Sequence, residues 1–318
     1  MSLLHELVRP RQVPFERRGD RFELELERPP ANRLEYLLEL ESRKGETQVV
    51  HDPANPVQAE GPFGAKSVLE FPEYRRPDWV DDAESPAGAL EQLDLGGRQA
   101  VQAIVWTAAE APAGPLPLLL VHDGPEYAEF SSLLRLLDHL VAFGELPPFR
   151  AALLPPPGDR NESYSASVRY ARVLVEDWLA QLEPFSGRPV GVGASLGALS
   201  LLHAHWTHPG TFGGLFLQSG SFFRRRLDSQ EARTPRFARI TRFVSRVFGG
   251  RGEVERIPVT LTCGTAEENL GNNRAVASAL ARQGWEARLV EHPDAHNWVS
   301  WRDSLHPHLT ELFLQAAA

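Results

Sequence analysis

A serine at the centre of a pentapeptide bounded by glycines is the residue best placed to act as a nucleophile. The pentapeptide, residues 193–197 (GASLG), follows the apolar run 189–192 and precedes the apolar run 199–206. A serine that projects its hydroxyl from a tight strand-to-helix turn requires almost no side chain two positions away on either side, and glycine meets this requirement. We therefore predict that Ser195 is a nucleophile and that the N–H of Leu196, at the start of a helix, donates to a developing oxyanion.

A serine nucleophile needs a base to take its proton and an acid to orient that base. After Ser195, one stretch carries candidate acids and a later stretch carries candidate histidines, which is the order nucleophile, acid, histidine. Each stretch directly follows a predicted strand. We predict Glu267 as the acid, with Glu268 and then Asp294 as alternatives. We predict His296 as the base, because it lies beyond the turn and before the last helix, whereas His292 is closer to the strand.

The second donor to an oxyanion is expected in the loop that follows the apolar strand 116–121. Gly124 in this loop allows a close approach of the backbone, but Pro125 has no N–H to donate. The sequence leaves Gly124 and Glu126 as the two candidates for this donor.

The elements that must position these residues alternate between strands and helices from Arg98 onward. The expected strands are 99–108, 116–121, 149–154, 189–192, 212–217, 258–263 and 286–290, and the expected helices are 130–143, 165–182, 199–206, 234–248, 272–283 and 299–316. This alternation predicts an α/β fold with a doubly wound, mostly parallel sheet, whose active site lies at the carboxyl ends of the strands.

The region before this alternation is rich in short strands that are punctuated by proline and glycine. Strands are expected at 21–26 (half-buried), 47–50 and 65–71, and residues 34–41 form either a strand or a helical turn. We predict a β-rich, sandwich-like N-terminal domain with its linker over residues 1–95, the linker itself being residues 77–97, and a catalytic domain over residues 96–318. The small domain either covers the larger one or closes one side of the active-site cleft.

Composition narrows the class of protein. The formal net charge is −9 and no basic stripe is present, so nucleic acid is not an expected partner. Cys263 is the only cysteine, and the histidines at 203, 205 and 208 have no carboxylate nearby in sequence, so neither a disulfide nor a metal site is expected. The first residues do not resemble a signal peptide and no stretch is long enough to cross a membrane, which favours a cytoplasmic location without membrane binding.

With these residues in place, the sequence resembles the enterochelin esterase family, within the esterase D-like group. Segments that resemble the family's motifs occur along most of the chain: residues 193–197 followed by 218–221 (QSGS), 122–124 (HDG), 159–162 (DRNE), 264–267 (GTAE), His296 with 301–302 (WR), 52–56 (DPANP) and 67–72 (SVLEFP). The resemblance implies an α/β-hydrolase fold and cleavage of ester bonds without a metal or an organic cofactor.

Family members related to the named enzyme open the trilactone of a ferric catecholate siderophore, and two departures separate this chain from them. Pro125 occupies a position where an N–H is expected, and the N-terminal domain is short and poor in aromatic residues. Ester chemistry therefore carries over, whereas siderophore specificity does not. We expect Asp123, Tyr127, Arg160 and Trp298 to line the substrate pocket.

Together these observations predict a serine esterase that acts on a small-molecule ester through an acyl-enzyme. An acyltransferase that uses the same triad is the alternative within enzymes. A binding module that keeps the fold without chemistry is the alternative from another class.

Overall fold

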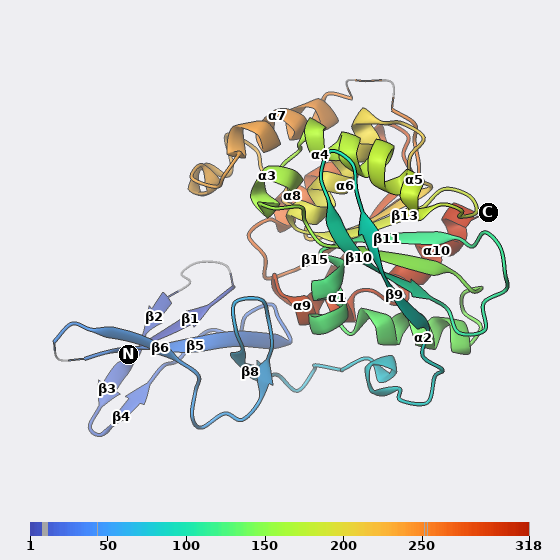
Figure 1. Ribbon diagram of the computed structural model, residues 1–318. Helices are drawn as coiled ribbons and strands as arrows, with labels where there is room; N and C mark the ends of the chain where they lie inside the picture. The colour runs from blue at the N-terminus through green and yellow to red at the C-terminus, as the bar shows by residue number, and fades with distance from the viewer. Residues whose placement is uncertain (8–11, 43, 251, 253, 318) are drawn as a thin grey trace.

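The computed structural model describes residues 1–7, 12–42, 44–250, 252 and 254–317. Figure 1 shows a small, mostly antiparallel β region formed by the N-terminal residues beside a larger α/β region that holds the rest of the chain.

The larger region is built on one eight-stranded sheet with the strand order β16-β15-β14-β13-β11-β12-β10-β9. Strands β11 to β16 run parallel to one another, whereas β10 pairs antiparallel with both β12 and β9 at one edge of the sheet. The strands are β9 (Ala89–Leu95), β10 (Val101–Thr107), β11 (Leu118–His122), β12 (Arg150–Leu154), β13 (Val190–Ala194), β14 (Gly214–Gln218), β15 (Val259–Gly264) and β16 (Ala287–His292). The predicted doubly wound, mostly parallel sheet is therefore confirmed.

Helices cover both faces of this sheet, because its central strands carry apolar residues on both sides. In β11, Leu118 and Leu120 belong to one buried cluster and Leu119 and Val121 to the other, as the period of two in a strand requires. The helices are α1 (Gly124–Phe130), α2 (Leu133–Ala142), α3 (Arg160–Tyr164), α4 (Val168–Arg172), the π-helix η2 (Val173–Trp178), α5 (Leu179–Leu182), α6 (Leu196–Thr207), α7 (Phe237–Phe248), α8 (Leu270–Arg282), α9 (Trp298–Asp303) and α10 (His308–Ala317), with short 3₁₀ turns η1 (Asp78–Asp81) and η3 (Ser229–Glu231).

Two of the expected helices are interrupted. The helix expected over 130–143 is divided by Ser132, whose φ of 50° is left-handed, so α1 ends before it and α2 begins after it. The helix expected over 299–316 is divided into α9 and α10 near Pro307, which lacks the N–H that a continuous helix would need.

The N-terminal region contains one six-stranded antiparallel sheet with the order β2-β1-β5-β8-β7, with β6 also paired to β5, and a separate β3–β4 hairpin. The strands are β1 (Ser2–His5), β2 (Gln12–Pro14), β3 (Glu16–Arg18), β4 (Arg21–Glu23), β5 (Arg33–Glu41), β6 (Thr47–Val50), β7 (Gln58–Ala59) and β8 (Lys66–Glu70). The half-buried strand expected at 21–26 is wrong in extent and in burial, because β4 ends at Glu23 and all three of its residues are exposed. The open choice for residues 34–41 is resolved as a strand.

The expected linker over residues 77–97 also needs correction. Trp79 and Val80 are buried in the larger core, and residues 89–95 form β9, which pairs with β10 along its full length. The apolar content of this stretch is low because β9 is an edge strand with one exposed face, and this low content is what indicated a linker. The division into residues 1–95 and 96–318 thus places one strand of the larger sheet in the smaller domain, and we propose a division before β9 instead.

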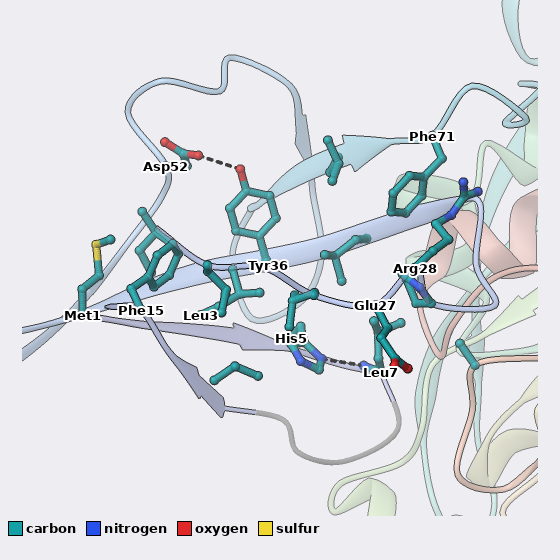
Figure 2. A pocket seen from close by; sticks show the side chains of 18 of the residues that line it. Met1, Leu3, His5, Leu7, Phe15, Glu27, Arg28, Tyr36, Asp52 and Phe71 are labelled. Atoms are coloured by element: carbon teal, nitrogen blue, oxygen red, sulfur yellow. Dashed lines mark hydrogen bonds between the residues drawn. The ribbon is translucent and has the colours of Figure 1, made fainter. Parts of the chain in front are cut away.

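An apolar cavity of about 910 Å³ lies against the N-terminal sheet and is open to solvent. Figure 2 shows aliphatic and aromatic side chains such as Leu3 and Phe15 around it, and the hydroxyl of Tyr36 donating to Asp52 at one side, over 2.7 Å.

Candidate active site

The nucleophile turn has the strained geometry that its sequence predicts. Ser195 has a φ of 56° and a ψ of −119°, and α6 begins at the next residue. A Cβ added to Gly193 would lie 2.9 Å from the carbonyl carbon of Gly197, so glycine is needed at position 193 for the two sides of the turn to approach. The turn places Ser195 at the carboxyl end of β13, near the centre of the sheet.

The expected acid and base lie at the ends of the two strands beyond β14. His296 Nδ1 is hydrogen-bonded to Glu267 Oε2 over 2.8 Å. The other oxygen of Glu267 accepts hydrogen bonds from the hydroxyl of Ser219 and the N–H of Gly264, each over 2.7 Å. Because Glu267 is only 5% exposed and holds three donors, the imidazole beside it is fixed in orientation.

Burial and charge act against each other in this pair. Burial disfavours the ionised form of Glu267, but His296 and the hydrogen bonds outweigh it and lower the pKa of this carboxyl. Burial likewise disfavours the imidazolium, but the Glu267 carboxylate outweighs it and raises the pKa of His296. The pair is therefore arranged to stabilise a proton on the imidazole.

The alternatives for acid and base are in different surroundings. His292 Nε2 is hydrogen-bonded to the hydroxyl of Ser300 over 2.7 Å, at the base of α9. Asp294 accepts the N–H of Ala295 and lies 3.9 Å from the guanidinium of Arg33. Neither side chain is bonded to His296, whereas Glu267 is.

Three residues that received no role from the sequence support this arrangement. Ser219, which has a left-handed φ of 49°, accepts the indole N–H of Trp301 over 2.9 Å while donating to Glu267. The hydroxyl of Ser221 lies 3.1 Å from that of Ser195. The segment 218–221 was visible in the sequence as part of a family motif, but the pairing of Ser219 with Trp301 joins segments that no local pattern relates.

The loop expected to supply the second oxyanion donor enters α1 through Asp123, whose φ of 51° is left-handed. A Cβ on Gly124 would lie 2.3 Å from the Cα of Leu153, so this position requires glycine. Arg160 binds both oxygens of Asp123, over 2.8 and 2.7 Å, and thereby holds the loop. Gly124 and Leu196 are the first residues of their helices, where backbone N–H groups have no partner within the helix.

Two cavities meet at Ser195 and His296, and they also share Glu6. One, of about 280 Å³, lies toward α8; the other, of about 320 Å³, lies between the larger region and the N-terminal sheet. Asp123, Arg160 and Trp298, which the sequence assigns to the substrate pocket, line the second cavity.

Tyr127 does not line these cavities, and its predicted place in the substrate pocket is wrong. Its side chain is fully buried, and its hydroxyl donates to Gln218 over 2.7 Å. Tyr127 lies on the face of α1 that packs into the core, and the helix over 124–130 that decides this orientation was expected to be a loop.

A short segment of the N-terminal region holds both loops of the acid–base pair. The N–H of Asn32 donates to the carbonyl of Pro293 over 2.6 Å, and the hydroxyl of Thr265 donates to the carbonyl of Pro30 over 2.5 Å. The two loops are also joined to each other, because Ala266 N–H donates to the carbonyl of Asp294 over 3.0 Å.

The described part of the chain contains neither a metal-binding cluster nor a membrane-spanning helix. No group of three or more His, Cys, Asp or Glu side chains there is arranged to hold a metal ion. In the same residues, no helix combines the length and the apolar character needed to cross a membrane.

The fold is that of an α/β-hydrolase, as the sequence predicted. The enterobactin esterase of Shigella flexneri, solved in the presence of 2,3-dihydroxy-N-benzoyl-serine, superposes with a TM-score of 0.75 and 19% identity, over 98% of this chain and 88% of that one. No family model matches the sequence.

Curated relatives point in the same direction. The iron(III) enterobactin esterase of Escherichia coli strain K12 is 26% identical over 290 residues, which is 85% of this chain and 69% of the relative. The protein of the same name from E. coli O6:H1 strain CFT073 is 29% identical over 195 residues, 57% of this chain and 48% of the relative. The chain thus spans about half the length of one relative and about two-thirds of the other. These matches confirm the resemblance to the enterochelin esterase family.

Proposed function

We propose that the protein is a serine esterase that hydrolyses small-molecule carboxylic esters through an acyl-enzyme. The observation that carries this proposal is the hydrogen bond between His296 and Glu267, with Ser195 on the wall of the same two cavities. The relatives named as esterases support the same class of reaction.

In the first half of the reaction, Ser195 Oγ attacks the ester carbonyl and His296 Nε2 takes the proton from Oγ. Glu267 accepts the hydrogen bond from Nδ1–H, stays ionised and stabilises the imidazolium that forms. His296 then donates the proton to the departing alkoxide, which leaves as an alcohol and an acyl group on Ser195.

In the second half, His296 takes a proton from water, and the resulting hydroxide attacks the acyl-enzyme. The carboxylic acid is released and Ser195 recovers its proton. In both halves the negative charge on the carbonyl oxygen is stabilised by the N–H of Leu196, with the N–H of Gly124 as the proposed second donor. Glu126 is the alternative second donor, because Pro125 has no N–H.

The proposal is tested by intact mass after treatment with a fluorophosphonate, together with hydrolysis of p-nitrophenyl esters of increasing acyl length. We expect one label per chain, ester turnover, and loss of both in Ser195→Ala, with kcat falling by roughly 10⁴ or more. Iron(III) enterobactin, for which the relatives are named, belongs in the panel. Absence of labelling together with absence of turnover would refute the proposal.

A further inference from the structure

The inference concerns which esters the cleft accepts, and it rests on the proposed function. The two cavities that meet at Ser195 and His296 form two arms of one cleft. The arm toward the N-terminal sheet contains an apolar wall, and we call it the aromatic arm; the other is the polar arm.

The wall of the aromatic arm comes from both regions of the chain. Trp298 and Trp301 belong to α9, and their rings meet edge to face with centroids 4.8 Å apart. Opposite them is the turn between β7 and β8, which contributes Pro62 and Phe63. A Cβ on Gly61 would lie 4.0 Å from the Trp298 ring, so this turn lies against the tryptophan.

Phe63 is the most unusual residue of this wall, because its side chain is 98% exposed. It lies in a turn whose Gly64 has a φ of 94°, and it lines the cavity that contains the nucleophile. An aromatic ring in such a position gains apolar contact only when a third group enters between it and Trp298. A flat apolar group of the substrate meets this requirement.

The charged side chains that line the cleft limit which charged substituents this apolar group of the substrate can carry. Nine Asp and Glu side chains line the two arms, against two Lys and Arg side chains. One of the nine, Glu35, is partly protonated near neutral pH because burial raises its pKa to about 7, and the others still outnumber the cations. Both of these cations have carboxylate partners: Arg160 binds Asp123 through two hydrogen bonds, and Lys66 is hydrogen-bonded to Glu6.

Two carboxylates of the polar arm accept hydrogen bonds from uncharged groups and not, among the described residues, from a Lys or Arg side chain. Asp228 accepts from the backbone N–H of Arg224 and from the amide of Asn272, and Glu231 accepts from the hydroxyl of Thr234. An anionic ester would therefore enter a negative field, and neither cation of the lining is free to bind it.

We propose that this esterase selects esters whose recognised group is an uncharged aromatic ring, held between Phe63 and Trp298, and that it disfavours anionic esters. The substrate proposed here differs from the one in the name of the curated relatives, because iron(III) enterobactin is an iron complex of deprotonated catechols and is therefore anionic. It also assigns a role to the N-terminal region, which supplies one side of the selective arm.

The first experiment compares p-nitrophenyl benzoate with mono-p-nitrophenyl isophthalate, which adds one carboxylate, and with p-nitrophenyl meta-(aminomethyl)benzoate, which adds one ammonium group. We expect kcat/KM for the anionic ester to be at least about tenfold below that for the benzoate, and the gap to narrow as salt is added. The cationic ester should equal or exceed the benzoate. Glu60→Gln removes one carboxylate from the aromatic arm, so it should reduce the difference in kcat/KM between the benzoate and the anionic ester.

The second experiment uses Phe63→Ala, with p-nitrophenyl acetate as an ester that has no ring. We expect the benzoate-to-acetate ratio of kcat/KM to fall by roughly twofold to tenfold, the range of an aromatic contact. The matched control is Phe143→Ala, because Phe143 is also exposed (67%) but lies at the end of α2 and does not line either arm. This control should leave the ratio unchanged.

The outcomes separate this proposal from the function on which it rests. If the panel is not hydrolysed and Ser195 is not labelled, the esterase itself is wrong. If the esters are hydrolysed but the anionic one is as good as the benzoate, or if iron(III) enterobactin matches the neutral esters, the charge selection is wrong. If Phe63→Ala leaves the benzoate-to-acetate ratio unchanged, the aromatic arm is wrong.

Discussion

Replacing Glu267 by glutamine tests the acid of the proposed triad by changing one oxygen to an NH₂ group at nearly constant volume. Glu267 Oε1 faces two donors, the hydroxyl of Ser219 and the backbone N–H of Gly264, while Oε2 faces His296. Because the N–H of Gly264 is a fixed donor, the amide oxygen should take the Oε1 position. The amide NH₂ then faces Nδ1 of His296.

An NH₂ group beside Nδ1 favours the tautomer that carries its proton on Nε2, so the ring cannot accept the proton of Ser195. We expect kcat to fall by roughly 10⁴, which corresponds to about 5.5 kcal/mol of lost transition-state stabilisation. The matched control is Glu268→Gln, which removes the same charge one residue further along. The kcat of Glu268→Gln should stay within about tenfold of that of the wild type.

The pH dependence provides a second readout with a defined sign. The Glu267 carboxylate raises the pKa of His296, and burial opposes it. Glu267→Gln removes the largest effect that raises the pKa of His296 and leaves the burial that lowers it, so the acidic limb of kcat/KM should move to lower pH. The lowered pKa of Glu267 also stabilises the wild type above about pH 4.5, and this stabilisation is lost as pH falls through the folded-state value. A small rate loss in Glu267→Gln, or a larger one in Glu268→Gln, would refute the assignment.

Three further predictions concern the surroundings of the triad. Ser219→Ala leaves the indole N–H of Trp301 buried without its acceptor, so the free energy of unfolding measured in urea should fall by about 1–3 kcal/mol. Because Ser219 also donates to Glu267, we expect a loss in kcat that is larger than any change in KM. Gly264→Ala would place a Cβ 2.3 Å from the carbonyl oxygen of Asp294, so we expect the acid and base loops to separate, with kcat falling at least about tenfold and a lower Tm. Burial raises the pKa of Glu35 to about 7, so the free energy of unfolding of the wild type should fall as pH rises from about 4.5 through 7. Glu35→Gln should lack this fall. Urea unfolding at pH 5 and pH 9 should therefore show that the stability of the variant relative to the wild type rises by up to about 3 kcal/mol between the two pH values.

The sequence was most informative where local patterns determine structure. The alternation of apolar runs predicted the positions of strands β10 to β16 along the chain, and the glycine spacing predicted the turn at Ser195. The preference for Glu267 and His296 over their neighbours rested on position after a strand, and the two side chains are hydrogen-bonded. Their catalytic roles stay predictions until the variants are measured.

The sequence was least informative where orientation depends on contacts between distant segments. Tyr127 was expected in the pocket because it follows the loop after a strand, but α1 turns it toward Gln218 in the core. Strand β9 was expected as a linker, because an edge strand with exposed residues has the composition of a loop. The support that Trp301 gives to Ser219 depends on α9 packing beneath the strand ends, which no local pattern indicates.

The hydrogen bond from Asn32 to Pro293 joins residues near opposite ends of the chain. A contact between residues so far apart in sequence closes a long loop, and the entropy lost in closing it must be paid before the contact stabilises the fold. During synthesis, Ser195 and its turn leave the ribosome well before the loop of His296. We therefore expect a growing chain to acquire its sheet first and its esterase activity only after the C-terminal segment has docked on the N-terminal region. Incomplete chains that end before His296 would then lack the proposed base for Ser195 and should not hydrolyse esters.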